Sequence, residues 1–141
     1  MHTLSIPILT VNSKGESVFK ALILSLNDYN GMFISERQEA LNFRHRWSAV
    51  GYESNWHLAG DPTLIIVQQG SIELRLKTGE AKTFSVGEQF VAADYLPEAL
   101  DQAENAGHKA RVIGNNDFSA LHIKLSDAPA QWTASQSKNI E

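Results

Sequence analysis

The residues of this sequence best suited to chemistry are its histidines. His45, His57, His108 and His122 lie in the body of the chain, and His57 follows a tryptophan in the stretch 51-GYESNWHLAGDPTLIIVQQG-70. A neutral imidazole can ligate a divalent metal, and it exchanges protons near neutral pH. The absence of cysteine excludes disulfides, thiolate metal sites and cysteine nucleophiles. A metal would therefore need histidine and carboxylate ligands.

The overall composition is that of an ordinary globular protein. The chain has 141 residues, of which 43% are hydrophobic and 20% charged, and this suits a single domain. Its net charge of −4 and its scattered basic residues give no electrostatic basis for nucleic-acid binding. The first residues lack the features of a signal peptide, and no apolar run is long enough to span a bilayer. We therefore expect a cytoplasmic protein without membrane contact.

The chain alternates between short strand-like segments and turns. The segment 18–28 is rich in β-forming residues and ends in the turn sequence NDYNG, and 63–70 is expected to form a hairpin with 71–79 across Gln69-Gly70. Further strands are predicted at 40–48, 81–86, 88–94, 109–114 and 118–126. About eight short strands with almost no helix predict an all-β fold, a double-sheet jelly roll.

Side-chain alternation predicts which residues face the interior. In 40-ALNFRHRWS-48, Leu41, Phe43, His45 and Trp47 share one face, and this apolar face is expected to point inward. His122 shares strand parity with Lys124, so it is expected on the outer surface.

One segment departs from the strand pattern. The run 97-PEALDQAENAG-107 begins with proline, has acidic residues in its first turn and ends with glycine, which predicts a short helix or an ordered loop. This insertion would act as a lid over a pocket. The polar tail, residues 127–141, is expected to be loose.

The stretch 51–70 resembles the first motif of the cupin superfamily, whose members are small jelly-roll barrels. That motif is a glycine, five residues, His-x-His, three or four residues, a glutamate, six residues and a glycine. In this chain the corresponding positions hold Gly51, His57, Ala59, Thr63 and Gly70. The spacing agrees throughout, but alanine replaces the second histidine and threonine replaces the glutamate.

The second cupin motif begins at a glycine, here Gly87, and ends in a histidine, here taken as His108. A direct count without the insertion would end on Glu98 instead. The resemblance covers roughly residues 40–126. It implies a cupin-type double-stranded β-helix, preceded by N-terminal strands in 1–39 that are a candidate arm for exchange between the subunits of a homodimer.

The resemblance also implies a barrel metal site, for which the motif positions supply only His57 and His108. A third ligand would come from Asp61, which has the strand parity of Ala59 and Thr63, or from His45. Two histidines and one carboxylate form the facial arrangement of non-haem iron and related sites. The expected ion would be one divalent iron, manganese, nickel or zinc.

If the metal site is incomplete, the barrel interior remains a pocket for a small organic molecule. Its predicted lining is His45, Trp47, His57, Thr63, Phe90 and His108. Three functions stay open: a small-molecule-binding barrel, a metal-dependent enzyme of the dioxygenase or isomerase type, and a structural dimerisation module with Phe19 and Phe33 exposed near the N-terminus. The carboxylates from Asp94 onward are expected to form an acidic rim or a solvated face.

Overall fold

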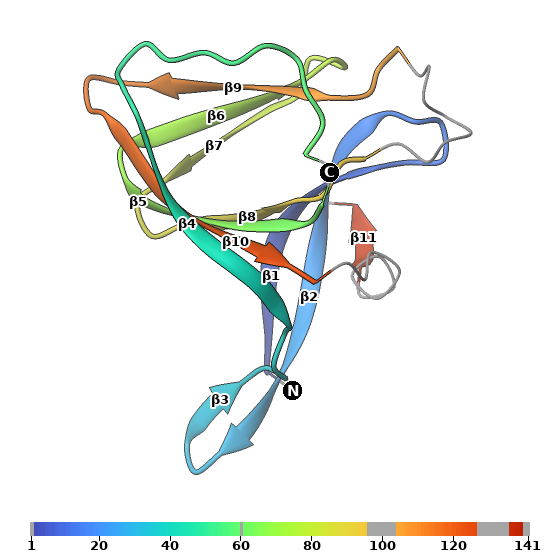
Figure 1. Ribbon diagram of the computed structural model, residues 1–141. Coiled ribbons are helices and arrows are strands. Elements are labelled where there is room, and N and C mark those ends of the chain that lie inside the picture. Colours follow the sequence, from blue (N-terminus) through green and yellow to red (C-terminus); the bar gives the residue numbers. More distant parts are fainter. Residues whose placement is uncertain (1, 60, 96–103, 127–135, 140–141) are drawn as a thin grey trace.

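The computed structural model describes residues 2–59, 61–95, 104–126 and 136–139 (Figure 1). These residues contain strands and no helix, and most of the predicted insertion at 97–106 lies outside them. Among the described residues there is therefore no helix that is long and apolar enough to cross a membrane. The strands are β1 (His2–Val11), β2 (Ser17–Tyr29), β3 (Met32–Ile34), β4 (Ala40–Ser48), β5 (Thr63–Gln69), β6 (Ser71–Leu76), β7 (Ala81–Ser85), β8 (Gln89–Ala92), β9 (His108–Ile113), β10 (Phe118–Leu125) and β11 (Gln136–Asn139).

The strands form two sheets that face each other. The large sheet has the order β11-β2-β1-β8-β5-β10-β4, with β3 paired to β2, and the small sheet has the order β7-β6-β9. In Figure 1 the small sheet lies above the large one. The main apolar core draws on both sheets, for example Phe90 and Phe118 from the large sheet and Ile72 and Leu74 from the small one. The predicted all-β jelly roll is confirmed.

The hairpin predicted across Gln69-Gly70 is wrong. β5 pairs with β8 and β10, whereas β6 pairs with β7 and β9, so the chain passes from one sheet to the other at this point. Gly70 has a φ of 72°, and a Cβ atom there would overlap the carbonyl oxygen of Asp117. Glycine is therefore required where the chain crosses between the sheets, although the sequence pattern predicted that Gly70 was an ordinary turn residue.

Two antiparallel hairpins turn at glycine, and the second of them confirms the turn predicted at NDYNG. β6 and β7 form an antiparallel hairpin around the 78-TGE-80 turn, with Ser71 opposite Ser85. β2 and β3 are joined at Asn30-Gly31, where both residues have positive φ as two-residue hairpin loops require.

The predicted facing of β4 is wrong. Leu41, Phe43 and Trp47 are 56%, 66% and 64% exposed, and His45 lies on the same outer face. The inward positions of β4 hold polar side chains because they border a cavity, as described below. Hydrophobic alternation identifies two faces of a strand, but it assigns the apolar face to the interior only where that interior is a packed core.

The outward placement predicted for His122 is wrong for a related reason. Phe118 and Ala120 on β10 are fully buried in the core between the sheets, and His122 shares their parity. Lys124 also points inward, into the same hollow region. The charged lysine was therefore a misleading marker of the outer face.

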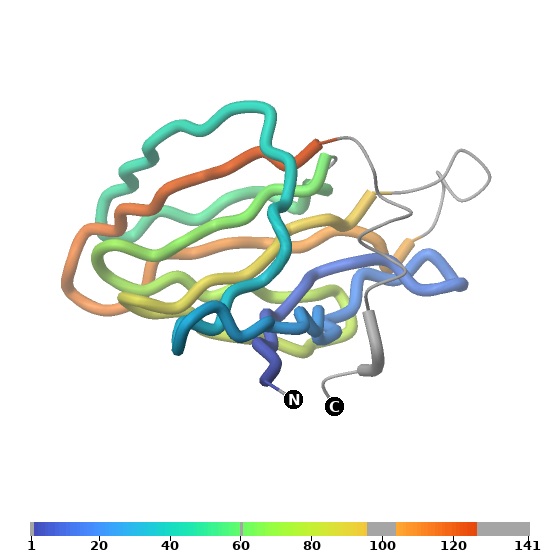
Figure 2. The backbone as a smooth tube through the Cα atoms, turned by 90° about the horizontal axis from the view of Figure 1, so that it is seen from below, coloured from blue at the N-terminus to red at the C-terminus, as the bar shows by residue number. Residues whose placement is uncertain are grey.

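The ends of the chain join the large sheet. β1 runs parallel to β8 and antiparallel to β2, and Phe19, expected to be exposed, is buried. β11 pairs with β2, so the tail is not loose over Gln136–Asn139. Residues 127–135 lie outside the described part. Figure 2 shows the blue segments β1 and β2 running side by side.

Candidate functional site

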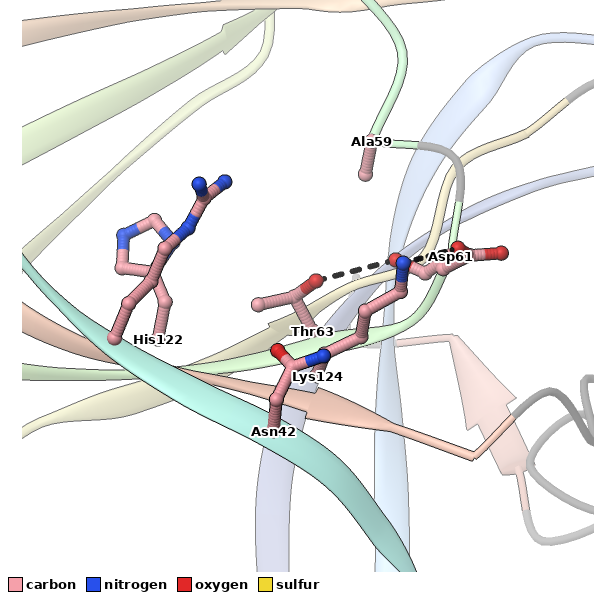
Figure 3. A pocket seen from close by; sticks show the side chains of 7 residues that line it. Asn42, Ala59, Asp61, Thr63, His122 and Lys124 are labelled. Atoms are coloured by element: carbon pink, nitrogen blue, oxygen red, sulfur yellow. Dashed lines mark hydrogen bonds and ion pairs between the residues drawn. The ribbon is translucent and has the colours of Figure 1, made fainter.

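Two adjoining cavities lie on the inner face of the large sheet. The first, called here the histidine cavity, has a volume of about 280 Å³ and is lined by His57, His108 and His122, by Arg44 and Arg46, and by apolar residues beneath them. The second, the lysine cavity, has a volume of about 330 Å³ and contains Lys124 and Asp61 (Figure 3). Both cavities share Arg44, Ala59, Thr63 and His122, so they form one continuous hollow.

The strand register explains which side chains meet in the histidine cavity. Arg44 on β4 pairs with His122 on β10, His122 pairs with Ile65 on β5, and Ile65 pairs with Phe90 on β8. Directly opposed residues in a sheet point to the same face. This row therefore presents two basic groups and then two apolar ones along the cavity wall.

The neighbouring row forms the lysine cavity. Asn42 pairs with Lys124, Lys124 with Thr63, and Thr63 with Ala92. In Figure 3, Thr63 lies between His122 on one side and the Asp61–Lys124 ion pair on the other. The Nζ of Lys124 lies 2.8 Å from Asp61 Oδ2. The only carboxylate lining this cavity within the described residues is thus already paired with a lysine.

The loop between β4 and β5 brings His57 to His108. Residues 52–57 run alongside β9, and His57 and His108 exchange two backbone hydrogen bonds of 3.0 and 2.9 Å. Their rings are 4.4 Å apart between centroids. Gly107, with a φ of 97°, permits this approach, because a Cβ there would crowd the His57 carbonyl. The two motif histidines therefore lie side by side.

A buried carboxylate behind His108 was missed in the sequence. Asp94 is fully buried, and His108 Nδ1 lies 2.8 Å from Asp94 Oδ2. The hydroxyl of Ser17 and the backbone N–H of Ala59 also donate to Asp94, each at 3.0 Å. Asp94 was expected on a rim or a solvated face. The signal that could have found it is its position at the end of the apolar run 90-FVAA-93.

The hydrogen bonds define how the two motif histidines can act. A carboxylate only accepts, so His108 donates from Nδ1, and its Nε2 is the free ring nitrogen. His57 Nδ1 lies 2.8 Å from the carbonyl oxygen of Asn55, so it too donates from Nδ1. Each ring therefore has its Nε2 atom left over for a hydrogen bond to a bound molecule.

The described residues do not supply the metal site that the cupin resemblance implied. They contain no group of three histidine, aspartate or glutamate side chains placed to hold an ion. Asp61 is paired with Lys124 in the lysine cavity, and His45 lies on the outer face of β4. Neither candidate third ligand joins His57 and His108. Since metal sites in such barrels need at least three converging protein ligands, the donor set does not fit a metal.

The predicted pocket residues separate into two groups. His57, Thr63, Phe90 and His108 line the histidine cavity, as expected. His45 and Trp47 do not, because the face of β4 is reversed. In their place the structure brings three residues that sequence reasoning did not assign to the pocket, Arg44, Arg46 and His122. If the inner face of β10 had been assigned from the apolar residues Phe118 and Ala120, His122 would have been predicted to line the pocket.

His122 is a half-buried base beside two arginines. Burial, together with the charges of Arg46 and Arg44, lowers the pKa of its imidazole from 6.5 to about 4. Its Nε2 atom is buried and has no hydrogen-bond partner among the described residues. His122 is therefore neutral at pH 7 and has an unused polar atom in the cavity wall.

The lowered pKa of His122 predicts a loss of stability in mild acid. As pH falls from 6.5 to about 4, the unfolded chain binds a proton at His122 that the folded chain does not, so folding weakens over this window. Because the ring is only partly buried, we expect this contribution to be about 1–2 kcal/mol. His122→Gln should reduce the loss, measured by urea unfolding at pH 7 and pH 4.5. His45→Gln, on the outer face, should not, and equal pH dependence in both variants would contradict the assignment.

The comparisons with known proteins concern the fold. No protein-family model and no curated protein matches the chain. Similar solved structures include the Schizosaccharomyces pombe Cnp3 cupin domain, at 10% identity, covering 93% of this chain and 88% of that one, with a TM-score of 0.48. A cupin 2 conserved barrel domain protein from Salinispora arenicola has 18% identity, 78% and 89% coverage and a TM-score of 0.43. A cupin-2 domain containing protein from Shewanella frigidimarina has 18% identity, 59% and 68% coverage and a TM-score of 0.41.

The chain has an all-β jelly-roll fold of two facing sheets. Its two facing sheets enclose the residues that match the first motif in spacing, with His57 and Thr63 at the cavity wall. Ala59, where the cupin motif has its second histidine, also lines the cavity. The residue spacing of the first cupin motif is therefore present in this chain, whereas the second histidine and the glutamate of that motif are not.

Proposed function

We propose that this barrel binds a small organic molecule in the histidine cavity, without a metal ion to hold it. The observation that carries the proposal is a hollow of about 280 Å³ with an apolar floor and several polar side chains converging on it. Concave, mostly apolar sites with a few placed polar groups are the usual form of small-molecule sites. A volume of this size suits a compound of metabolite dimensions.

The polar groups support binding because they are held in place. The His108 ring is fixed by Asp94, and the His57 ring by the carbonyl of Asn55. Groups that are already oriented lose little conformational entropy when a ligand arrives. Proton transfer at the free Nε2 atoms is the chemistry that these two histidines would offer to a bound molecule.

The test fills the cavity without removing a polar group. Ala59 lines both cavities, so the Ala59→Phe variant should place a ring in the hollow. Ala81→Phe, on an exposed position of β7, is the matched control. We expect small aromatic and aliphatic compounds to give saturation-transfer NMR signals with the wild type and with Ala81→Phe. These signals should be lost with Ala59→Phe.

Two outcomes would contradict this proposal. One is the absence of binding by any compound of a panel that spans acids, amides and amines. The other is unchanged binding to Ala59→Phe with a retained folded spectrum, which would place the compounds outside the cavity.

A second candidate function, assembly into a homodimer, is favoured by the outer face of the large sheet. On β4 this face carries the exposed Leu41, Phe43 and Trp47. Exposed apolar area of this kind on a sheet is typical of a contact with another chain. Exchange of the N-terminal strands between subunits stays a prediction.

The molar mass in solution tests the dimer. Sedimentation equilibrium should give twice the monomer mass for the wild type. Trp47→Glu should give the monomer mass, because a charge on this face opposes burial. A wild type that is monomeric at high concentration would contradict this second candidate and leave the cavity proposal untouched.

A further inference from the structure

We propose that the molecule bound in the histidine cavity is a small carboxylate, whose anionic group is held by Arg44 and Arg46. This inference rests on the proposed function and names its ligand class. It also assigns a role to two arginines that the cupin motif does not contain.

The distribution of charge is the first argument. The chain has a net charge of −4, yet the described lining of the histidine cavity has two arginines and no carboxylate. Asp94 lies behind His108, and its carboxylate already accepts hydrogen bonds from Ser17, Ala59 and His108. No carboxylate among the described residues forms an ion pair with Arg44 or Arg46. An anion from solution would supply the missing counter-charge.

The geometry of the two arginines is the second argument. They lie two positions apart on β4, so both side chains point to the inner face. Arg46 Nε donates to the hydroxyl of Ser48 at 3.1 Å, and its guanidinium lies over the rings of Tyr52 and Phe118, 5.2 and 5.3 Å from their centroids. These contacts fix the guanidinium without using its two Nη nitrogens, whose fork geometry matches a carboxylate.

The neighbours of the arginines leave room for that group. Arg46 is opposite Ala120, the smallest side chain of this face, and Arg44 is opposite His122. The buried Nε2 of His122 has no protein partner, so in its neutral form the ring can donate a hydrogen bond there to an anion.

The rest of the cavity indicates the body of the ligand. Below the arginines the wall is made of Phe90, Phe118, Ile72 and Leu74. An aromatic ring or a short hydrocarbon chain would bury its surface against these residues, which favours binding by about 25 cal/mol for each Å² removed from water. The ligand class is therefore a carboxylate attached to a compact apolar body.

The test compares carboxylates with their uncharged amides. Benzoate, phenylacetate and hexanoate are titrated into the wild type beside benzamide, phenylacetamide and hexanamide, with phenyl phosphate as a second anion. We expect each acid to bind about ten times or more tightly than its amide, in line with the strength of charge-assisted hydrogen bonds. Phenyl phosphate should bind more weakly than benzoate, since the cavity is built for a planar group.

Variants then assign the effect to the two arginines. Arg44→Gln should weaken acid binding by about tenfold and leave amide binding unchanged. Arg46→Lys, which keeps the charge but not the fork, should weaken it less than Arg46→Gln. Arg37→Gln, the same change on an exposed residue outside the cavity, is the matched control and should have no effect.

The outcomes separate this inference from the proposed function. If acids and amides bind equally and the arginine variants match the wild type, the carboxylate assignment is wrong while the cavity function stands. If phenyl phosphate binds more tightly than every carboxylate, the anion class is wrong. If no compound binds the wild type, both the inference and the proposed function fail.

Discussion

Asp94→Ala should lower the free energy of unfolding by about 3–5 kcal/mol, among the largest effects of any single change in this chain. The reason is that Asp94 is fully buried and accepts hydrogen bonds from Ser17, Ala59 and His108. Removing the carboxylate leaves the donors of Ser17 and His108 in the interior without this acceptor, whereas the Ala59 N–H keeps the backbone carbonyl of residue 94. The measurement is urea unfolding at pH 7.5, followed by tryptophan fluorescence and far-UV circular dichroism.

Two further variants make this expectation specific. Asp94→Asn keeps the shape and one acceptor oxygen, so its loss should be smaller, about 1–2 kcal/mol. Asp61→Ala removes an exposed carboxylate paired with Lys124 and should cost less than about 1 kcal/mol. In Asp94→Asn the amide can donate to His108, so ¹⁵N NMR should show the His108 proton moved from Nδ1 to Nε2. A loss for Asp94→Ala no larger than that for Asp61→Ala would contradict the buried network.

Phe118→Ala should be destabilising by about 3–5 kcal/mol, whereas Trp47→Ala should cost the monomer less than about 1 kcal/mol. Phe118 is fully buried between the two sheets, and its removal leaves a cavity in the core. Trp47, although larger, is 64% exposed on the outer face of β4. The two residues are close in the sheet but point to opposite faces. Trp47 on β4 is opposite Ser119 on β10, and Ser119 is the residue after Phe118.

This pair of variants tests the facing of β4. Denaturant unfolding is measured at low protein concentration, so that contacts between chains do not contribute. A larger loss for Trp47→Ala than for Phe118→Ala would reverse the assignment of inner and outer faces. It would also remove Arg44 and Arg46 from the cavity, because they share the face opposite to Trp47.

Part of the candidate site was predictable from motif spacing. The glycine-to-glycine interval of 51–70 correctly placed His57 and Thr63 at the cavity wall, and the second motif placed His108 beside them. The arginines were not predicted. Their residue type argued for the solvent side of β4, and only a polar hollow beneath the strand makes the inner side favourable for them. Asp94 was missed because a single carboxylate after an apolar run does not reveal its three donors.

The sequence by itself determined the all-β class, most strand boundaries and the turns that join β2 to β3 and β6 to β7, because these depend on local propensity and on backbone freedom at glycine and asparagine. It also determined that cysteine chemistry is absent. Only the tertiary structure decided which face of β4 and β10 is internal, and that 69–70 is a crossing between sheets. A period of two divides a strand into two faces, but which face is buried depends on what the neighbouring strands and the opposite sheet place against it. In this protein the neighbouring strands and the opposite sheet leave a cavity against the inner face, and basic side chains line that cavity.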